Sequence, residues 1–219
     1  MVPADPPSHR KPPPRESEFV IPLHPQGNQF FIDTRLNGQT QAKLLLDTGA
    51  TTVVLSEKLA QKLGFNYFHT MPQVKAETAG GTIWAPLLSL RKVRAGVAVV
   101  EEVEAIISPK LIKVDGLMGM TFLSQFKMKL DHASAVLTLK PLMDPPLYDG
   151  KPKAWWKQKF SDYRSKIRHF KRLAEDLKKK GDAKAFNVEK TVLHYEALYT
   201  QLKARGNKSG IPSDLKPGK

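Results

Sequence analysis

Apolar and polar residues alternate in short runs over the first two thirds of the chain, and turn residues separate the runs. The clearest pair, residues 29–36 and 40–46, flanks Asn37-Gly38, a dipeptide typical of tight β-hairpin turns. Only two brief stretches, 57–63 and 121–125, have a helical pattern. This spacing predicts a small, closed, mostly antiparallel β unit. Its expected strands are residues 19–23, 29–36, 40–46, 53–55, 74–79, 83–93, 97–100, 103–107, 126–130 and 135–139.

The pattern changes period after about residue 150. Apolar residues then recur in steps of three and four, which places them along one face of a helix over residues 153–180. Gly181-Asp182 interrupts the pattern, and a second apolar face ends at Gly206. Two such helices joined by a short loop predict an antiparallel hairpin that buries one face on itself, on the β unit or on a partner. The expected buried positions are Trp156, Phe160, Tyr163, Ile167, Phe170, Ala174, Leu177, Val188, Val192, Tyr195, Tyr199 and Leu202.

These patterns divide the 219 residues into five segments. A proline-rich linker over 1–18 precedes a β domain over 19–141, and a second linker over 142–152 leads to the helical hairpin over 153–206. A flexible tail is expected over 207–219. The proline-rich opening also suggests that a preceding segment has been removed.

Positive charge is concentrated after the β domain. Residues 151–219 hold 19 Lys and Arg against seven Asp and Glu, so they carry +12 of the total formal charge of +14. The simplest interpretation is a solvated helix face. The alternative is a surface that docks a partner or an anionic surface, either membrane or nucleic acid, through non-specific electrostatics. No specific nucleic-acid recognition is predicted.

Several classes of chemistry are disfavoured by composition. The chain has no cysteine, so it has neither disulfides nor a thiolate nucleophile. Its six histidines lack ligand spacing, and it contains neither a Gly-x-Ser-x-Gly elbow nor a glycine-rich phosphate loop. We therefore expect no metal site and no cofactor. We expect a periplasmic or membrane-associated location if an N-terminal anchor has been removed, and a cytoplasmic location otherwise.

The strongest candidate for chemistry is Asp47, which an apolar run delivers into the turn Thr48-Gly49. An ionised carboxylate at the end of a buried strand must be paired, solvated or protonated, which makes Asp47 the candidate catalytic residue. The alternative is an ordinary Asx turn in which Gly49 supplies an unusual backbone angle. The chain also contains Asp33, Asp115 and Asp131 near strands or turns, and for these we expect solvated or structural roles.

Three segments in this order resemble the retropepsin-type aspartic proteases, in particular the bacterial single-lobed, retroviral-like members. They are residues 45–50 (Leu-Leu-Asp-Thr-Gly-Ala), the Gly80-Gly81 hairpin, and residues 117–119 (Leu-Met-Gly) before a short helix. The resemblance covers about residues 19–141. It implies a mainly β fold, a single-lobed pepsin-like closed barrel, to which the α-helical hairpin is appended at the C-terminal end.

The resemblance also implies a mechanism. Family members use two facing Asp residues, so a chain with one Asp-Thr-Gly is expected to form a symmetric homodimer with Asp47 from each copy. The pair shares one proton: one carboxylate activates a water as general base, and the other donates to the peptide carbonyl. The expected activity is endopeptidase cleavage of extended protein or peptide segments. Thr48 would bond across the twofold axis, Gly49 would let the backbone approach the partner and the water closely, and Ala50 would support the site.

The remaining motif residues would support this site. Leu117, Met118 and Gly119 would pack behind the catalytic turn. A flap formed by Ala79, Gly80, Gly81 and Thr82 would close over the peptide.

Two positions depart from the retroviral pattern. Thr51 and Met120 stand where those enzymes commonly have an Asp and an Arg that pair near the dimer interface. The alternative function is a non-catalytic peptide-binding or dimerisation module that its basic helical tail docks to nucleic acid or membrane.

Overall fold

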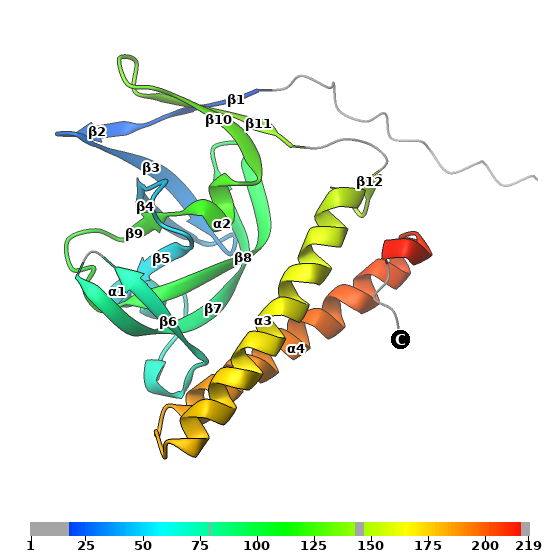
Figure 1. Ribbon diagram of the computed structural model, residues 1–219. Coiled ribbons are helices and arrows are strands. Elements are labelled where there is room, and N and C mark those ends of the chain that lie inside the picture. The colour runs from blue at the N-terminus through cyan, green and yellow to red at the C-terminus, as the bar shows by residue number, and fades with distance from the viewer. Residues whose placement is uncertain (1–17, 79, 143–146, 216–219) are drawn as a thin grey trace, which may run out of the picture.

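The computed structural model describes residues 18–78, 80–142 and 147–215, which form a β domain and a helical hairpin packed along one side of it (Figure 1). Nearly all of the proline-rich segment expected over residues 1–18 lies outside the described residues. The short helices of the β domain are α1 (Glu57–Lys62), η1 (Phe68–Thr70) and α2 (Met120–Leu123). Its strands are β1 (Phe19–Pro22), β2 (His24–Gln26), β3 (Gln29–Leu36), β4 (Thr40–Leu46), β5 (Val53–Ser56), β6 (Gln73–Thr78), β7 (Gly81–Ala95), β8 (Ala98–Ser108), β9 (Gly116–Met118), β10 (Phe126–Asp131) and β11 (Val136–Pro141).

The main sheet closes into the barrel that the alternating pattern predicts. Its strand order is β2-β3-β4-β9-β5-β8-β7-β6, and an additional pairing of β3 with β7 joins the two sides. Most neighbours are antiparallel, but β9 runs parallel to β4, and β5 runs parallel to β8. The runs 97–100 and 103–107, expected as two strands, form the single strand β8. Closure buries residues such as Ile32, Leu44 and Leu90 completely in the interior of the barrel.

A separate three-stranded sheet, in the order β1-β11-β10, adjoins the barrel. Ile21 of β1 and Leu137 and Leu139 of β11 belong to the same hydrophobic cluster as the barrel interior. The first and last strands of the β domain therefore pair with each other and help to cover one core.

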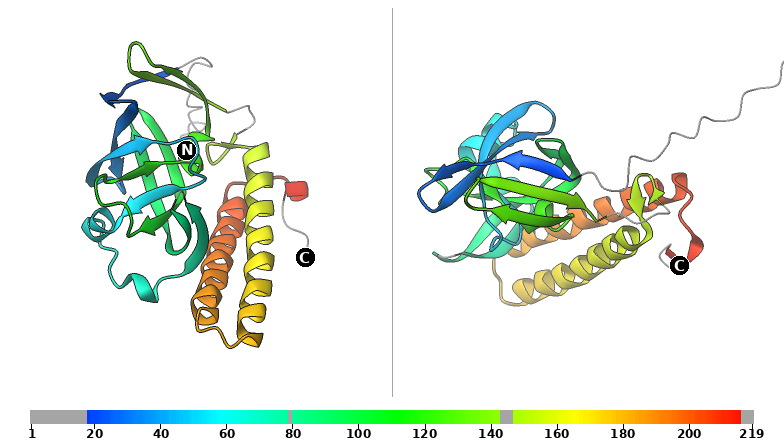
Figure 2. Two further views of the ribbon diagram at one scale, coloured as in Figure 1. Left: turned by 60° about the vertical axis from the view of Figure 1, so that its left-hand side comes forward. Right: turned by 90° about the horizontal axis from the view of Figure 1, so that it is seen from above.

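The helical hairpin consists of α3 (Lys153–Lys179) and α4 (Ala185–Lys208). Its inner face carries the apolar positions that the periodicity predicts. Trp156, Phe160 and Tyr163 of α3 and Val188 and Tyr195 of α4 are all at most 4% exposed. Both views in Figure 2 place the two helices side by side against the β domain. These side chains form a second hydrophobic cluster with β-domain residues, so the hairpin packs on the β domain as well as on itself.

The connecting segments contain more secondary structure than the sequence pattern indicates. Within the expected linker over residues 142–152, β12 (Leu147–Tyr148) and β13 (Lys151–Pro152) form a small antiparallel hairpin. The expected flexible tail from residue 207 is largely ordered, because α4 extends to Lys208 and the turn η2 (Ser213–Leu215) follows. Ile211 and Leu215, which are 4% and 6% exposed, anchor this end in the second cluster.

No helix among the described residues is long and apolar enough to cross a membrane.

Candidate active site

Asp47 lies at the end of β4, where the chain turns out of the barrel wall. Its backbone N–H donates to the carbonyl oxygen of Met118 (3.2 Å), which ties the turn to β9. Its Oδ1 atom accepts hydrogen bonds from the amides of Gly49 (2.9 Å) and Ala50 (3.2 Å). Within the part of the chain that the structure describes, Oδ2 has no hydrogen-bond partner. The carboxylate is thus fixed through one oxygen and free at the other.

This geometry contains the Asx turn of the alternative interpretation, but it differs from that interpretation in one respect. Gly49 does not adopt a left-handed φ. Its lack of a side chain matters for space instead, because a Cβ at this position would lie 3.2 Å from Asp47 Oδ1. Asp47 and Ala50 are half-buried, whereas Thr48 and Gly49 are exposed. The tip of the turn is therefore open to a second molecule.

Residues 117–119 support the Asp47 turn from behind. Gly119 is buried, and a Cβ built on it would lie only 2.0 Å from the carbonyl oxygen of Thr52 and 2.8 Å from that of Ala50. The next amide, that of Met120, donates to the same Ala50 oxygen (2.9 Å). Leu117 and Met118 belong to β9, which pairs with both β4 and β5. The structure thus places the two sequence motifs, residues 45–50 and 117–119, in direct backbone contact.

One supporting residue was missed in the sequence. The hydroxyl of Thr121 accepts a hydrogen bond from the Val53 amide (2.9 Å) and donates one to the Glu104 carbonyl (2.9 Å). It therefore joins α2 to β5 and β8 beside the Asp47 turn. A threonine at the start of a short helix carries no periodic signal that would identify it.

The expected flap is the tip of the β6–β7 hairpin. Ala79 lies outside the described residues, and Gly80, Gly81 and Thr82 are exposed. Gly81 has a φ of 93°, which favours glycine at this position. The side chain of Lys110, in the loop between β8 and β9, donates to the Gly80 carbonyl (3.0 Å). This contact ties the hairpin tip to a loop of the same chain, and no sequence pattern indicates it.

An apolar row crosses the sheet and ends beside Asp47. Leu45 of β4 is paired with Leu117 of β9, Leu117 with Val54 of β5, and Val54 with Ile106 of β8. Because successive side chains of a strand point to opposite faces, Asp47 follows Leu45 onto the same face of the sheet. The carboxylate therefore adjoins an apolar row whose nearest members, Leu45 and Leu117, are half-buried.

The other acidic candidates have structural partners. Asp33 pairs with His24 at 2.6 Å, and Asp115 accepts a bond from the Lys43 amide at 3.0 Å. The carboxylate of Asp131 caps the β10–β11 turn, and the Ser134 amide holds the pKa of Asp131 below its ordinary value. No group of three or more potential metal ligands occurs among residues 18–78, 80–142 and 147–215.

Comparison with known proteins finds a family model and solved structures that this chain resembles. The sequence profile of the family described as gag-polyprotein putative aspartyl protease matches residues 32–125. This range includes the Asp47 turn, the β6–β7 hairpin and residues 117–119. A retropepsin-like aspartic protease from Rickettsia conorii, known from a crystal structure, is 27% identical in sequence, with a TM-score of 0.47. The match covers 56% of this chain and 89% of that chain. No curated protein sequence gives a significant match.

Proposed function

We propose, from the premise that the β domain is retropepsin-like, that this chain is an aspartic endopeptidase that cleaves extended polypeptide segments. The observation that carries the proposal is the state of Asp47. Two backbone amides orient its Oδ1, its Oδ2 is free of hydrogen-bond partners in the described part of the chain, and the turn that holds it is exposed. A carboxylate that served only to stabilise its own turn would not need an open apolar surface beside it.

The proposed site needs two copies of the chain. One chain supplies a single Asp-Thr-Gly, and the exposed Thr48 and Gly49 provide a surface on which a second turn can pack. Two carboxylates at hydrogen-bond distance cannot both ionise easily, so they would hold one proton between them. The symmetric homodimer is thus part of the catalytic proposal and not a separate one.

The pair would act by general acid and base catalysis. The ionised carboxylate removes a proton from a bound water as the water attacks the peptide carbonyl carbon. The protonated carboxylate donates to the carbonyl oxygen, which gives a neutral tetrahedral intermediate. Transfer of a proton to the amide nitrogen then releases the two peptide products. No covalent bond forms between the enzyme and the substrate.

The β6–β7 hairpin would contribute the substrate-binding backbone. An extended peptide can add to strand edges through main-chain hydrogen bonds, which makes the binding tolerant of sequence. In this role Gly80 and Gly81 would allow the tip to close over the peptide, and breakage of the Lys110 contact would let the tip open.

The test is cleavage of unfolded casein between pH 3 and pH 7 by the wild type and by Asp47→Asn. The variant should lose at least about a hundredfold in kcat/KM, because it removes the general base and the shared proton. A pepstatin-type inhibitor should block the wild type. Asp33→Asn is the matched control, since it removes an exposed carboxylate elsewhere in the barrel and should retain activity. Sedimentation of each variant reports whether the dimer persists.

Retention of cleavage by Asp47→Asn would contradict the catalytic role. An intact dimer that cleaves nothing over this pH range would instead favour the non-catalytic peptide-binding module.

A further inference from the structure

The helical hairpin covers one end of the apolar row that begins beside Asp47. The row runs through the paired residues Leu45, Leu117, Val54, Ile106 and Leu87. Leu87 is 1% exposed, Ile106 is 6% exposed and Val54 is 9% exposed, whereas Leu117 and Leu45 are only half-buried. Burial of the row thus decreases steadily toward the Asp47 turn. The helical hairpin is the element that buries the far end of the row.

The covering surface is aromatic. Trp156, Phe160 and Tyr163 of α3 and Tyr195 of α4 lie in one hydrophobic cluster with Leu87, Ile106 and Val54. The rings of Phe170 and Tyr195 stack at 5.6 Å, which joins the two helices across this surface. These aromatic side chains cover an apolar surface of the β domain that the apolar side chains of a bound peptide would otherwise cover.

A charged contact fixes the hairpin beside the covered end of the row. Glu104 precedes Ile106 by two residues on β8 and so faces the same side. Its Oε2 atom accepts hydrogen bonds from Lys166 Nζ of α3 (2.6 Å) and from the Tyr195 hydroxyl of α4 (2.8 Å). Burial, followed by the charge of Glu104, raises the pKa of Tyr195, so this hydroxyl remains a donor. One carboxylate therefore holds both helices.

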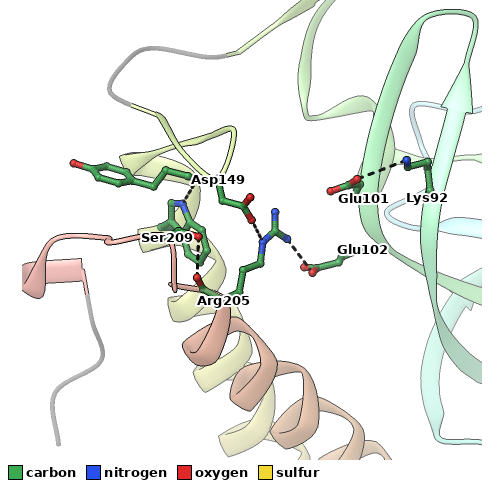
Figure 3. A network of polar contacts seen from close by, with 8 residues as sticks. Lys92, Glu101, Glu102, Asp149, Arg205 and Ser209 are labelled. Carbon is green, nitrogen blue, oxygen red and sulfur yellow. Dashed lines mark hydrogen bonds and ion pairs between the residues drawn. The ribbon is translucent and has the colours of Figure 1, made fainter. Parts of the chain in front are cut away.

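Two further contacts hold the hairpin at its ends. Near one end, the Thr191 hydroxyl donates to the Gln73 carbonyl at the start of β6 (2.7 Å). At the other end, Arg205 of α4 bridges Glu102 of β8 and Asp149 of the β12–β13 turn, as Figure 3 shows. All of these contacts are polar, and the Glu104 and Arg205 side chains are partly exposed, so a substitution at either position leaves no apolar cavity in the core.

We infer that the docked hairpin is an intramolecular competitor for polypeptide substrates of the proposed protease. Neighbouring strands lie about 4.8 Å apart, so Val54 is ~10 Å from Leu45 along the row, a distance that about three extended residues cover. A substrate that continues further on this side meets the aromatic face of α3 and α4. Long substrates therefore require the hairpin to move, whereas peptides with three or fewer residues on that side do not.

The test weakens the central contact in the full-length chain. Glu104→Lys places a cation against Lys166 and should raise kcat/KM for unfolded casein about tenfold, which corresponds to ~1.4 kcal/mol of lost docking. Cleavage of a short peptide with two residues on either side of the scissile bond should change less than about twofold, because by the spacing above it does not reach the hairpin. Tyr195→Phe, which removes only the hydroxyl, gives a smaller change in the same direction if Glu104→Lys does not fold.

The matched control is the charge swap Glu104→Lys with Lys166→Glu. It restores an ion pair at the same place and should return casein cleavage to about the wild-type rate. Hydrogen exchange in α3 and α4 should increase in Glu104→Lys and revert in the swap, which measures docking without any substrate.

The outcomes separate this inference from the proposed function on which it rests. Cleavage by all variants with no gain on casein, or with equal gains on casein and the short peptide, overturns the competitor role and leaves the protease intact. Failure of every variant to cleave either substrate, when hydrogen exchange shows that the hairpin has undocked, overturns both.

Discussion

Replacement of Gly119 by alanine should destabilise the β domain strongly. The added Cβ would lie 2.0 Å from the Thr52 carbonyl oxygen and 2.8 Å from the Ala50 carbonyl oxygen. Both obstacles are backbone atoms, so no side-chain rotation relieves the contact, and β9 must move away from the Asp47 turn. That movement also stretches the hydrogen bond from the Met120 amide to Ala50.

Overpacking of a dense core usually costs ~1–3 kcal/mol, and the two backbone contacts place this substitution at about 3 kcal/mol. For a chain of this size, a loss of about 3 kcal/mol lowers the melting temperature by ~6–12 °C. Urea unfolding followed by circular dichroism measures the free energy directly.

The matched control for this prediction is Gly49→Ala. Its Cβ meets only a side-chain atom, Asp47 Oδ1 at 3.2 Å, at an exposed position. We expect a change of at most about 0.5 kcal/mol in its unfolding free energy, as for most surface substitutions. A loss below about 1 kcal/mol in Gly119→Ala would refute the argument, because overpacking against fixed backbone atoms should cost more than that. An equal loss in both variants would refute it as well.

Two other predictions concern activity and pH. Although it should fold, Gly49→Ala should lower kcat/KM on casein about tenfold, because its Cβ would displace Asp47 Oδ1 by a few tenths of an ångström, and a displacement of ~1 Å can cost about a hundredfold. Unchanged kinetics would show that Oδ1 need not hold its position. Burial, assisted by Lys166 and opposed by Glu104, lowers the pKa of His194 from 6.5, so the folded chain binds a proton there less readily than the unfolded chain. Stability should therefore fall as the pH drops below about 6.5. The urea midpoints at pH 7.5 and 5.5 should differ less in His194→Gln than in the wild type. Equal differences would contradict the assignment of this pH dependence to His194.

The sequence predicted those features that depend on local pattern. Strand alternation identified the β3–β4 hairpin. The end of the second alternating run, residues 40–46, placed Asp47 at a turn, as observed. Steps of three and four identified the aromatic face of α3, including Trp156 and Phe160, which are buried. In each case the signal comes from neighbouring residues whose burial follows from the geometry of a single element.

Contacts between distant segments were not predictable in this way. Glu104 lies 62 residues from Lys166 and 91 from Tyr195, and no periodicity connects them. The sequence left open whether the hairpin packs on itself, on the β domain or on a partner, and the structure shows that it packs on the β domain. The tail beyond residue 207 was misjudged because Ile211 and Leu215 are isolated apolar residues, and isolated residues carry no period.

The proposed paired active site is compatible with the docked hairpin. The proposed dimer contact uses the Thr48-Gly49 tip, which is exposed with the hairpin in place. The hairpin covers the opposite end of the apolar row, at Ile106 and Leu87. Pairing of two Asp47 turns and docking of the helices therefore use different surfaces, and one does not require loss of the other. A dimer that assembles with both hairpins docked would hold its carboxylates ready, and access of long substrates would then depend on the strength of the Glu104 contact in each copy.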